Sequence, residues 1–170
     1  MKILVTGGSK CGKSTFAENL AQRMANGSPV TYIATMQVVD AEDLAVVARH
    51  KKQREGQNYQ VIEQQKNLSA LTLEKDATVL LEDIPNLLAN EMFLDGCPDK
   101  VEESLMALSE TARHIVFVTN EVGSDGFPYD EDTLRYLSRI SQVNRAIAQH
   151  CEHVVEVVCG IPLYIKGAPV

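Results

Sequence analysis

The sequence predicts an α/β fold, with a mostly parallel β-sheet covered by helices on both faces and ending in an antiparallel hairpin. Short β-rich runs alternate with longer amphipathic helical patterns, which is typical of parallel sheets with crossover helices. The last two β-rich runs are separated only by Cys159 and Gly160, a spacing that suits a hairpin. At 170 residues, the chain is expected to form a single domain over residues 1–170.

The expected strands are short runs rich in β-branched and apolar residues. They are Lys2–Thr6, Thr31–Ala34, Gln60–Ile62, Thr78–Leu81, His114–Thr119, Val154–Val158 and Ile161–Lys166. The expected helices have apolar residues recurring at spacings of three and four. They are Lys13–Met24, Ala41–Arg54, Lys100–Ala112 and Glu131–Gln149. Asp40 is placed to cap the second helix, and the polar segments Gln53–Asn67 and Gly123–Asp130 are expected to be surface loops.

The composition favours a protein that acts on a small ligand. Hydrophobic residues make up 45% of the chain and charged residues 23%, and no apolar run approaches the ~20 residues of a membrane-spanning helix. The first residues resemble no signal peptide, so we expect a cytoplasmic protein. A formal net charge of −7 argues against a nucleic-acid partner. The four cysteines lack the spacing of a zinc site or a disulfide framework.

A phosphate-binding loop (P-loop) follows the first expected strand. The full motif G-x-x-x-x-G-K-[ST] is matched by Gly7-Gly8-Ser9-Lys10-Cys11-Gly12-Lys13-Ser14. Its glycines let backbone N–H groups point at phosphate oxygens, and the following helix adds its positive dipole end. Lys13 is expected to reach the β- and γ-phosphates, and the Ser14 hydroxyl to ligate Mg²⁺. The alternative, a glycine-rich turn without a ligand, fits this context poorly. The loop therefore predicts binding of a nucleoside triphosphate.

Two acidic residues end the strand Thr78–Leu81. Glu82 and Asp83 lie where parallel sheets bind their ligands, and P-loop catalysis needs a carboxylate there to hold Mg²⁺ or its waters. Alternatively, both acids only begin the next turn. The residues alone do not decide between Glu82 and Asp83 as the magnesium ligand.

A basic segment ends the second expected helix, with the sequence Arg49-His50-Lys51-Lys52-Gln53-Arg54. An imidazole among cations could act as a nucleophile on a phosphoryl group, because the cations keep its pKa low and neutralise the attacked group. Equally, cations at a helix C-terminus offset the helix dipole without any further function. The residues alone leave the role of His50 open.

Taken together, these segments resemble the bifunctional adenosylcobinamide kinase/adenosylcobinamide-phosphate guanylyltransferase family of cobalamin biosynthesis. The resemblance is carried, in order, by Ile3–Gly8 with the rest of the P-loop, Tyr32-Ile33-Ala34-Thr35, Arg49-His50-Lys51 and Val118-Thr119-Asn120-Glu121-Val122-Gly123. Leu80-Leu81-Glu82 and Val143-Asn144 extend it. It spans nearly the whole chain and is far more specific than a P-loop alone.

The resemblance implies two reactions, phosphorylation of the aminopropanol hydroxyl of adenosylcobinamide and then transfer of GMP onto that phosphate. His50 would be the guanylylated residue, and Lys13 would stabilise the departing pyrophosphate. GTP (or ATP for the kinase step) and Mg²⁺ are the implied cofactors, with Glu82 rather than Asp83 as the carboxylate ligand of Mg²⁺ beside Ser14. A homo-oligomer is implied as well. Beside the P-loop, the residues implied around the nucleotide are Ile33, Ala34, Thr35, Lys51, Lys52, Arg54, Glu63 and Glu82.

The chain also departs from the family pattern in its C-terminal half. An Arg-Asp pair and a later glycine are replaced by Leu137-Ser138 and Ser141, and Arg145 stands where a glutamine follows Asn144. These changes concern the kinase reaction and corrinoid recognition more than the binding of GTP. Two alternative functions stay open, a small-molecule P-loop kinase without the guanylyltransferase step and a catalytically reduced GTP-binding protein.

Overall fold

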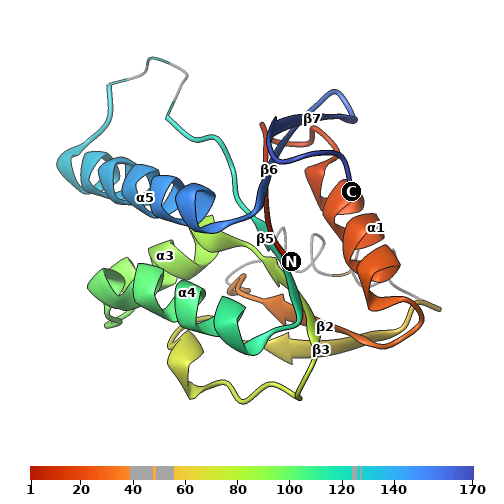
Figure 1. Cartoon of the computed structure of the whole chain (residues 1–170). Helices are drawn as coiled ribbons and strands as arrows, with labels where there is room; N and C mark the ends of the chain where they lie inside the picture. Colours follow the sequence, from red (N-terminus) through yellow and green to blue (C-terminus); the bar gives the residue numbers. More distant parts are fainter. Residues whose placement is uncertain (39–47, 49–55, 124–125, 127) are drawn as a thin grey trace.

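Strands and helices alternate along most of the chain in the computed structural model (Figure 1). The structure describes residues 1–38, 48, 56–123, 126 and 128–170. The strands are β1 (Lys2–Thr6), β2 (Val30–Ala34), β3 (Tyr59–Glu63), β4 (Thr78–Glu82), β5 (His114–Val118), β6 (His153–Val158) and β7 (Ile161–Lys166). The helices are α1 (Lys13–Ala25), α3 (Ile84–Phe93), α4 (Val101–Thr111) and α5 (Glu131–His150), with short 3₁₀ turns at Leu68–Ala70 and Pro98–Lys100.

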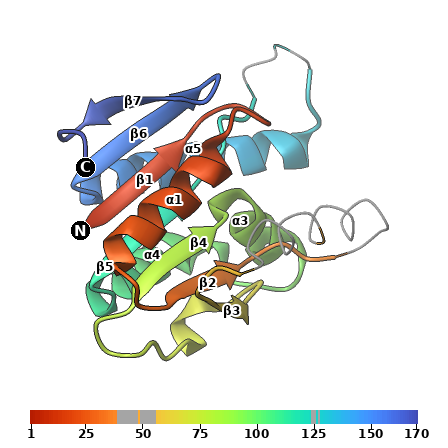
Figure 2. The same ribbon diagram turned by 90° about the vertical axis from the view of Figure 1, so that its right-hand side faces the viewer.

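The described strands form one sheet in the order β3-β2-β4-β5-β1-β6-β7. Figure 2 shows β7 and β6 toward one edge of this sheet and β2 and β3 toward the other. Every neighbouring pair is parallel except β6 and β7, which are antiparallel. The predicted α/β fold with a terminal hairpin is therefore confirmed. In this order β5 lies between β1, which precedes the P-loop, and β4, which is followed by the acidic pair Glu82 and Asp83.

Helices cover both faces of the sheet (Figure 1), with α1 on one face and α3, α4 and α5 on the other. Alternate residues of each central strand enter the two cores. In β1, Ile3 and Val5 pack with α1, whereas Leu4 packs in the core under α5. Since β1 is buried on both faces, the residue that follows it is held rigidly at the carboxyl edge of the sheet.

The predicted strands and three of the predicted helices agree with the structure to within one residue at each end. The agreement is good because these elements have strong hydrophobic periodicity and are bounded by residues that favour turns. The fourth predicted helix, Ala41–Arg54, and its Asp40 cap lie outside the described residues. In the predicted loop Gly123–Asp130, the described residues form neither helix nor strand.

Helix α3 is absent from the sequence prediction. It is only ten residues long, and Ile84, Leu87 and Leu88 are all buried, so it lacks the polar face that reveals an amphipathic helix. Its start does carry a signal. The Asp83 side chain accepts a hydrogen bond from the Asn86 backbone N–H at 2.8 Å, and a proline follows in the first turn, where no backbone donor is required.

Candidate nucleotide-binding site

The P-loop connects β1 to α1 with a backbone that needs glycine at two places. Gly7 has φ 147° and Gly12, which caps α1, has φ 96°, and other residues are strained at such angles. A Cβ atom on Gly7 would lie 2.5 Å from the carbonyl oxygen of Val157. A side chain at Gly7 would therefore push the loop away from β6.

Four carbonyl groups of the loop are bound from the protein side. The Gly7 oxygen accepts from the Glu121 N–H at 3.3 Å, and the Cys11 oxygen accepts from the Gly160 N–H at 2.8 Å. The Gly12 oxygen accepts the first helical bond, from Phe16, at 3.0 Å. Lys13 donates to the Gly8 oxygen at 3.1 Å. These bonds fix the backbone of the loop, whose N–H groups would bind phosphate as in other P-loops.

Lys13 and Ser14 begin helix α1, as the motif requires. The lysine side chain is only 7% exposed and folds back over the loop, while Ser14 is half-buried beside it. The first turn of α1 contains no acidic residue, so the positive end of the helix dipole is not offset there. Ser9 and Lys10 are exposed on the outer part of the loop.

Glu82 and Asp83 lie at the end of β4, one strand beyond β5 from the P-loop. The Glu82 carboxylate accepts a hydrogen bond from the Tyr32 hydroxyl at 3.0 Å. Burial raises the pKa of Asp83 to about 6, with the Glu82 charge adding to it, while hydrogen bonds from Asn86 and the Lys13 charge oppose the rise. The two acids therefore lie within electrostatic reach of each other and of the P-loop lysine.

Thr35 joins the end of β2 to these acids. Its hydroxyl donates to the Asp83 carbonyl and accepts from the Asp83 N–H, both at 2.7 Å. Its own N–H donates to the Glu82 carbonyl at 3.1 Å, and Asn90 of α3 donates to its carbonyl at 2.8 Å. The Thr35 side chain is fully buried. Thr35 thus fixes the backbone of Glu82 and Asp83 through these hydrogen bonds.

The remaining predicted residues lie in three different places. The Ile33 side chain is buried in the core and Ala34 is half-buried, so the segment before Thr35 presents mainly backbone to the edge. Glu63 is exposed at the end of β3, four strand spacings or roughly 19 Å from β1. The structure does not bring it to the P-loop. His50, Lys51, Lys52 and Arg54 lie outside the described residues.

The end of β5 borders a cavity of about 330 Å³ between α5 and the sheet. Thr119 is buried there and donates to the Asn144 side chain of α5 at 2.8 Å. Its N–H donates to the Val5 carbonyl at 2.9 Å. Residues Thr119–Gly123 belong to a segment that carries the family resemblance, but sequence reasoning missed Tyr32 as the partner of Glu82 and Asn90 as the support of Thr35. Neither residue has a local signal, since both contacts join distant segments.

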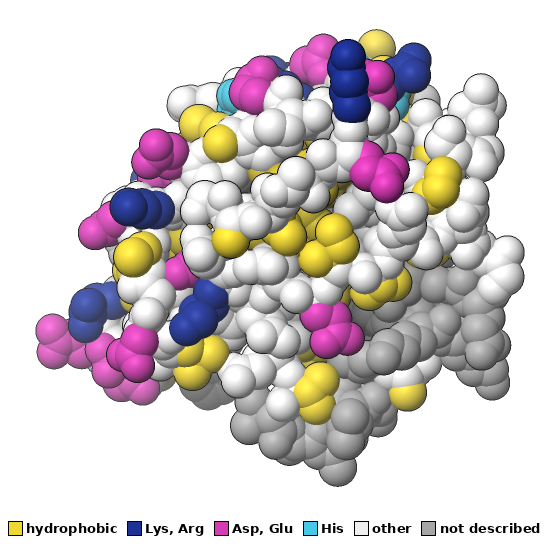
Figure 3. Space-filling model, turned by 90° about the horizontal axis from the view of Figure 1, so that it is seen from below, with side chains coloured by type: hydrophobic (Ala, Val, Ile, Leu, Met, Phe, Trp, Pro, Cys, Tyr) yellow, Lys and Arg dark blue, Asp and Glu magenta, His cyan; other side chains and the backbone are white. Residues whose placement is uncertain are grey.

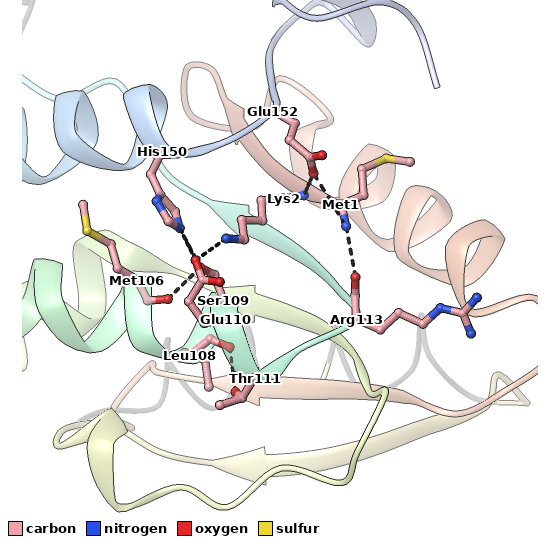
Figure 4. Close-up of polar contacts among 10 residues, drawn as sticks. All are labelled: Met1, Lys2, Met106, Leu108, Ser109, Glu110, Thr111, Arg113, His150 and Glu152. Carbon is pink, nitrogen blue, oxygen red and sulfur yellow. Dashed lines mark hydrogen bonds and ion pairs between the residues drawn. The ribbon is translucent and has the colours of Figure 1, made fainter.

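A group of Ser109, Glu110 and His150 on the opposite edge of the sheet looks at first like a catalytic triad (Figure 4). The Ser109 oxygen is 2.7 Å from His150 Nε2, but Ser109 is buried and donates to the Met106 carbonyl. Glu110 approaches the same Nε2 at 3.6 Å and pairs with Lys2, which lowers its pKa. A triad needs its acid on the other ring nitrogen and an accessible serine. This group fastens α4 and α5 to the start of β1.

Charged side chains of both signs lie on one face of the described surface. On the face seen from below, Lys and Arg side chains are scattered among Asp and Glu (Figure 3). Among the described residues, no three His, Cys, Asp or Glu side chains gather as a metal site. None of the described helices is long and apolar enough to cross a membrane.

Comparison with known proteins shows which family this chain resembles. Residues 3–165 match the family described as cobinamide kinase / cobinamide phosphate guanyltransferase. The chain belongs to this family. Members of this kinase and guanyltransferase family are transferases, and the family match covers the P-loop, both acids, the end of β5 and His50.

Two relatives of the family align along almost their whole length. The bifunctional adenosylcobalamin biosynthesis protein CobP of Pseudomonas aeruginosa is 34% identical, with 99% of each chain covered. The bifunctional adenosylcobalamin biosynthesis protein CobU of Escherichia coli is 30% identical, with 98% of this chain and 100% of the relative covered.

Similarity of fold extends outside the family. The flagellar accessory protein FlaH from Methanocaldococcus jannaschii is similar over 97% of this chain and 77% of its own, with a TM-score of 0.51 and 15% sequence identity. At that identity the likeness concerns the fold alone.

Proposed function

We propose that this chain is an adenosylcobinamide kinase and adenosylcobinamide-phosphate guanylyltransferase that works through a guanylylated His50. The observation that carries the proposal is the complete P-loop, with Lys13 folded over it and two acids beyond β5, in a chain whose residues 3–165 match the family. A P-loop alone would support any nucleotide-dependent reaction.

In the kinase reaction, the hydroxyl oxygen of the acceptor attacks the γ-phosphorus, and the bond to the β-phosphate oxygen breaks. The loop N–H groups and Lys13 stabilise the charge that builds up on the phosphate oxygens. The hydroxyl proton passes to a carboxylate at the edge.

In the guanylyltransferase reaction, an imidazole nitrogen of His50 attacks the α-phosphorus of GTP, and pyrophosphate leaves. The phosphate oxygen of the acceptor then attacks the same phosphorus, and the bond to His50 breaks. Lys13 and the loop N–H groups hold the pyrophosphate as it departs. Because the first product leaves before the acceptor reacts, one loop can serve both steps.

A magnesium ion would be held by oxygen ligands from Ser14 at the start of α1 and Glu82 at the end of β4, since Mg²⁺ commonly takes one or two protein oxygens together with phosphates and waters. The ion would neutralise phosphate charge. The Tyr32 hydroxyl, which donates to Glu82 at 3.0 Å, orients that carboxylate.

Covalent labelling tests the proposal. The protein is mixed with Mg²⁺ and GTP labelled at the α-phosphate, denatured and examined for bound label. We expect an acid-labile, alkali-stable adduct that is missing from the His50→Ala variant. His114→Asn is the matched control, because His114 begins β5 at the far edge of the sheet, and it should keep the label. GTP binding without any adduct would support the plain kinase and contradict the histidine mechanism.

We also propose that the chain associates with further copies of itself. The edge strand β7 exposes several apolar side chains, with Ile161 at 62%, Leu163 at 48% and Ile165 at 64%, and the register shift in its pairing with β6 falls at Ile165. Exposed apolar side chains on an edge strand promote association. The proposed partner is a second copy of this chain.

A further inference from the structure

Two polar groups of the cavity between α5 and the sheet have no partner among the described residues. Asn120 Oδ1 is shielded from solvent and accepts no hydrogen bond from any described residue. Leaving such an acceptor unpaired costs about 1–3 kcal/mol. Arg145 is exposed at the same cavity and has no ion pair with the part of the chain that the structure describes. The cavity therefore offers an acceptor for one hydrogen bond and a cation for an anion.

The rest of the lining is largely apolar. Leu4 of β1, Val154 of β6 and Ile140 of α5 line the cavity together with Leu137 and Ala148. A ligand that fills this space would combine a small apolar group, a hydrogen-bond donor and a negative charge.

The cavity adjoins the P-loop. Thr6, the last residue of β1, lines it and is followed directly by Gly7. Glu121 also lines it and holds the Gly7 carbonyl through its N–H at 3.3 Å. A group bound in the cavity is thus close to the place where the loop would hold the terminal phosphates, on the α5 side of the sheet.

Three residues of α5 reach this cavity. Leu137, Ser141 and Arg145 all line it, and together they span two turns of the helix. A substitution at any of them would therefore change the cavity.

We propose that this cavity holds the aminopropanol phosphate arm of the corrinoid acceptor, with Arg145 facing the phosphate. The assignment rests on the proposed function. The arm offers a methyl group for the apolar lining, an amide N–H for Asn120 Oδ1 and a phosphate for Arg145. At about 330 Å³ the cavity is at the small end of ligand sites, which run from ~300 to 1,000 Å³. A cavity of this size accommodates the aminopropanol phosphate arm, and the corrin ring lies outside it.

Equilibrium binding of adenosylcobinamide phosphate, without any nucleotide, tests the assignment. Arg145→Gln should weaken it roughly 20-fold, since a charge-assisted hydrogen bond to phosphate is lost, and Arg145→Lys should recover part of the loss. Binding of unphosphorylated adenosylcobinamide should change little in Arg145→Gln. Ser141→Leu, which narrows the cavity, should weaken both corrinoids.

Controls separate this assignment from the proposed function. Arg135→Gln changes an exposed arginine on α5 that pairs with Asp132 and does not line the cavity, and it should bind both corrinoids like the wild type. All variants should bind Mg²⁺-GTP normally. If the wild type binds the corrinoid phosphate and Arg145→Gln and Ser141→Leu bind it equally well, the cavity assignment is wrong and the proposed function stands. If the wild type binds no corrinoid, both fail.

Discussion

Lys13 places a positive charge at the P-loop, where phosphates would bind. Its ammonium group is nearly buried and held by the Gly8 carbonyl, so it is already positioned before a nucleotide binds. A preorganised cation loses little side-chain entropy on binding, and its contribution to affinity is correspondingly large.

Replacing Lys13 by methionine should weaken Mg²⁺-GTP binding on the order of 100-fold, or about 2.7 kcal/mol. Methionine keeps an unbranched apolar side chain in place of the lysine stem, so the loss reports the charge and its hydrogen bonds. Isothermal titration calorimetry measures it. Lys10→Asn is the matched control, because Lys10 is exposed with φ 56°, a conformation that asparagine tolerates. Similar losses in the two variants would contradict the special role of Lys13.

Asp83 should make stability depend on pH. Its pKa is raised from 3.8 to about 6 in the folded protein, so the fold favours the protonated carboxyl. The resulting stabilisation is complete below pH 3.8 and is lost as the pH rises through about 6. Asp83→Asn keeps a good helix cap and removes the ionisation. Relative to the wild type, it should gain stability between pH 4 and 7 in thermal melts, and a constant difference over that range would rule this out.

At the scale of elements, the P-loop depends on the hairpin that closes beside it. The Gly160 N–H in the β6–β7 turn holds the Cys11 carbonyl at 2.8 Å, and Val157 of β6 faces Gly7. The sequence motif predicts the loop and its ligand chemistry, because the glycine and lysine positions follow from local geometry. It does not predict the hairpin as the support of the loop, because that contact joins residues about 150 positions apart.

Gly7→Ala should destabilise the unliganded protein by more than about 2 kcal/mol, since the new methyl group meets the Val157 carbonyl and φ is strained. Gly8→Ala makes the same chemical change in open space, with no atom within 4 Å. Urea unfolding of the two variants compares them directly. Equal stability would mean that β6 does not pack against the loop as described.

Thr35→Val should cost about 1–3 kcal/mol, because the buried Asp83 N–H loses its hydrogen-bond acceptor. Thr31→Val is matched in shape and burial, on the same strand segment, and should change stability by less than about 0.5 kcal/mol. Chemical denaturation gives both values. A Thr35→Val variant as stable as the wild type would show that the Thr35 bridge contributes nothing.

Viewed as a whole, the molecule combines features that its sequence predicts and others that it does not. Repeated β-rich and amphipathic runs are enough for the layers, because each pattern acts within one element. The insertion of β5 between β1 and β4 is set by packing among distant segments. It separates Glu82 from the P-loop by one strand and brings Thr119 and Asn120 between them. The sequence therefore predicted the P-loop and the acidic residues after β4, but it did not predict that one strand separates them.

Self-association would involve contacts between whole molecules. If β7 forms the contact, Ile161→Glu combined with Ile165→Glu should shift the protein toward the monomer in sedimentation velocity, since both side chains are highly exposed. Val61→Glu is the control, because Val61 is also exposed but lies on the opposite edge strand β3. A wild-type protein that sediments as a monomer at micromolar concentration would contradict self-association.

The position of β1 affects how the protein can be made. A ribosome delivers this strand well before its two neighbours in the sheet, β5 and β6, which begin only at residues 114 and 153. The Gly160 contact to Cys11 arises even later in synthesis. A nascent chain therefore carries the whole phosphate-binding motif through the synthesis of more than 140 further residues without the support that shapes it. A chain interrupted before β6 would carry the motif without the contacts that hold the loop.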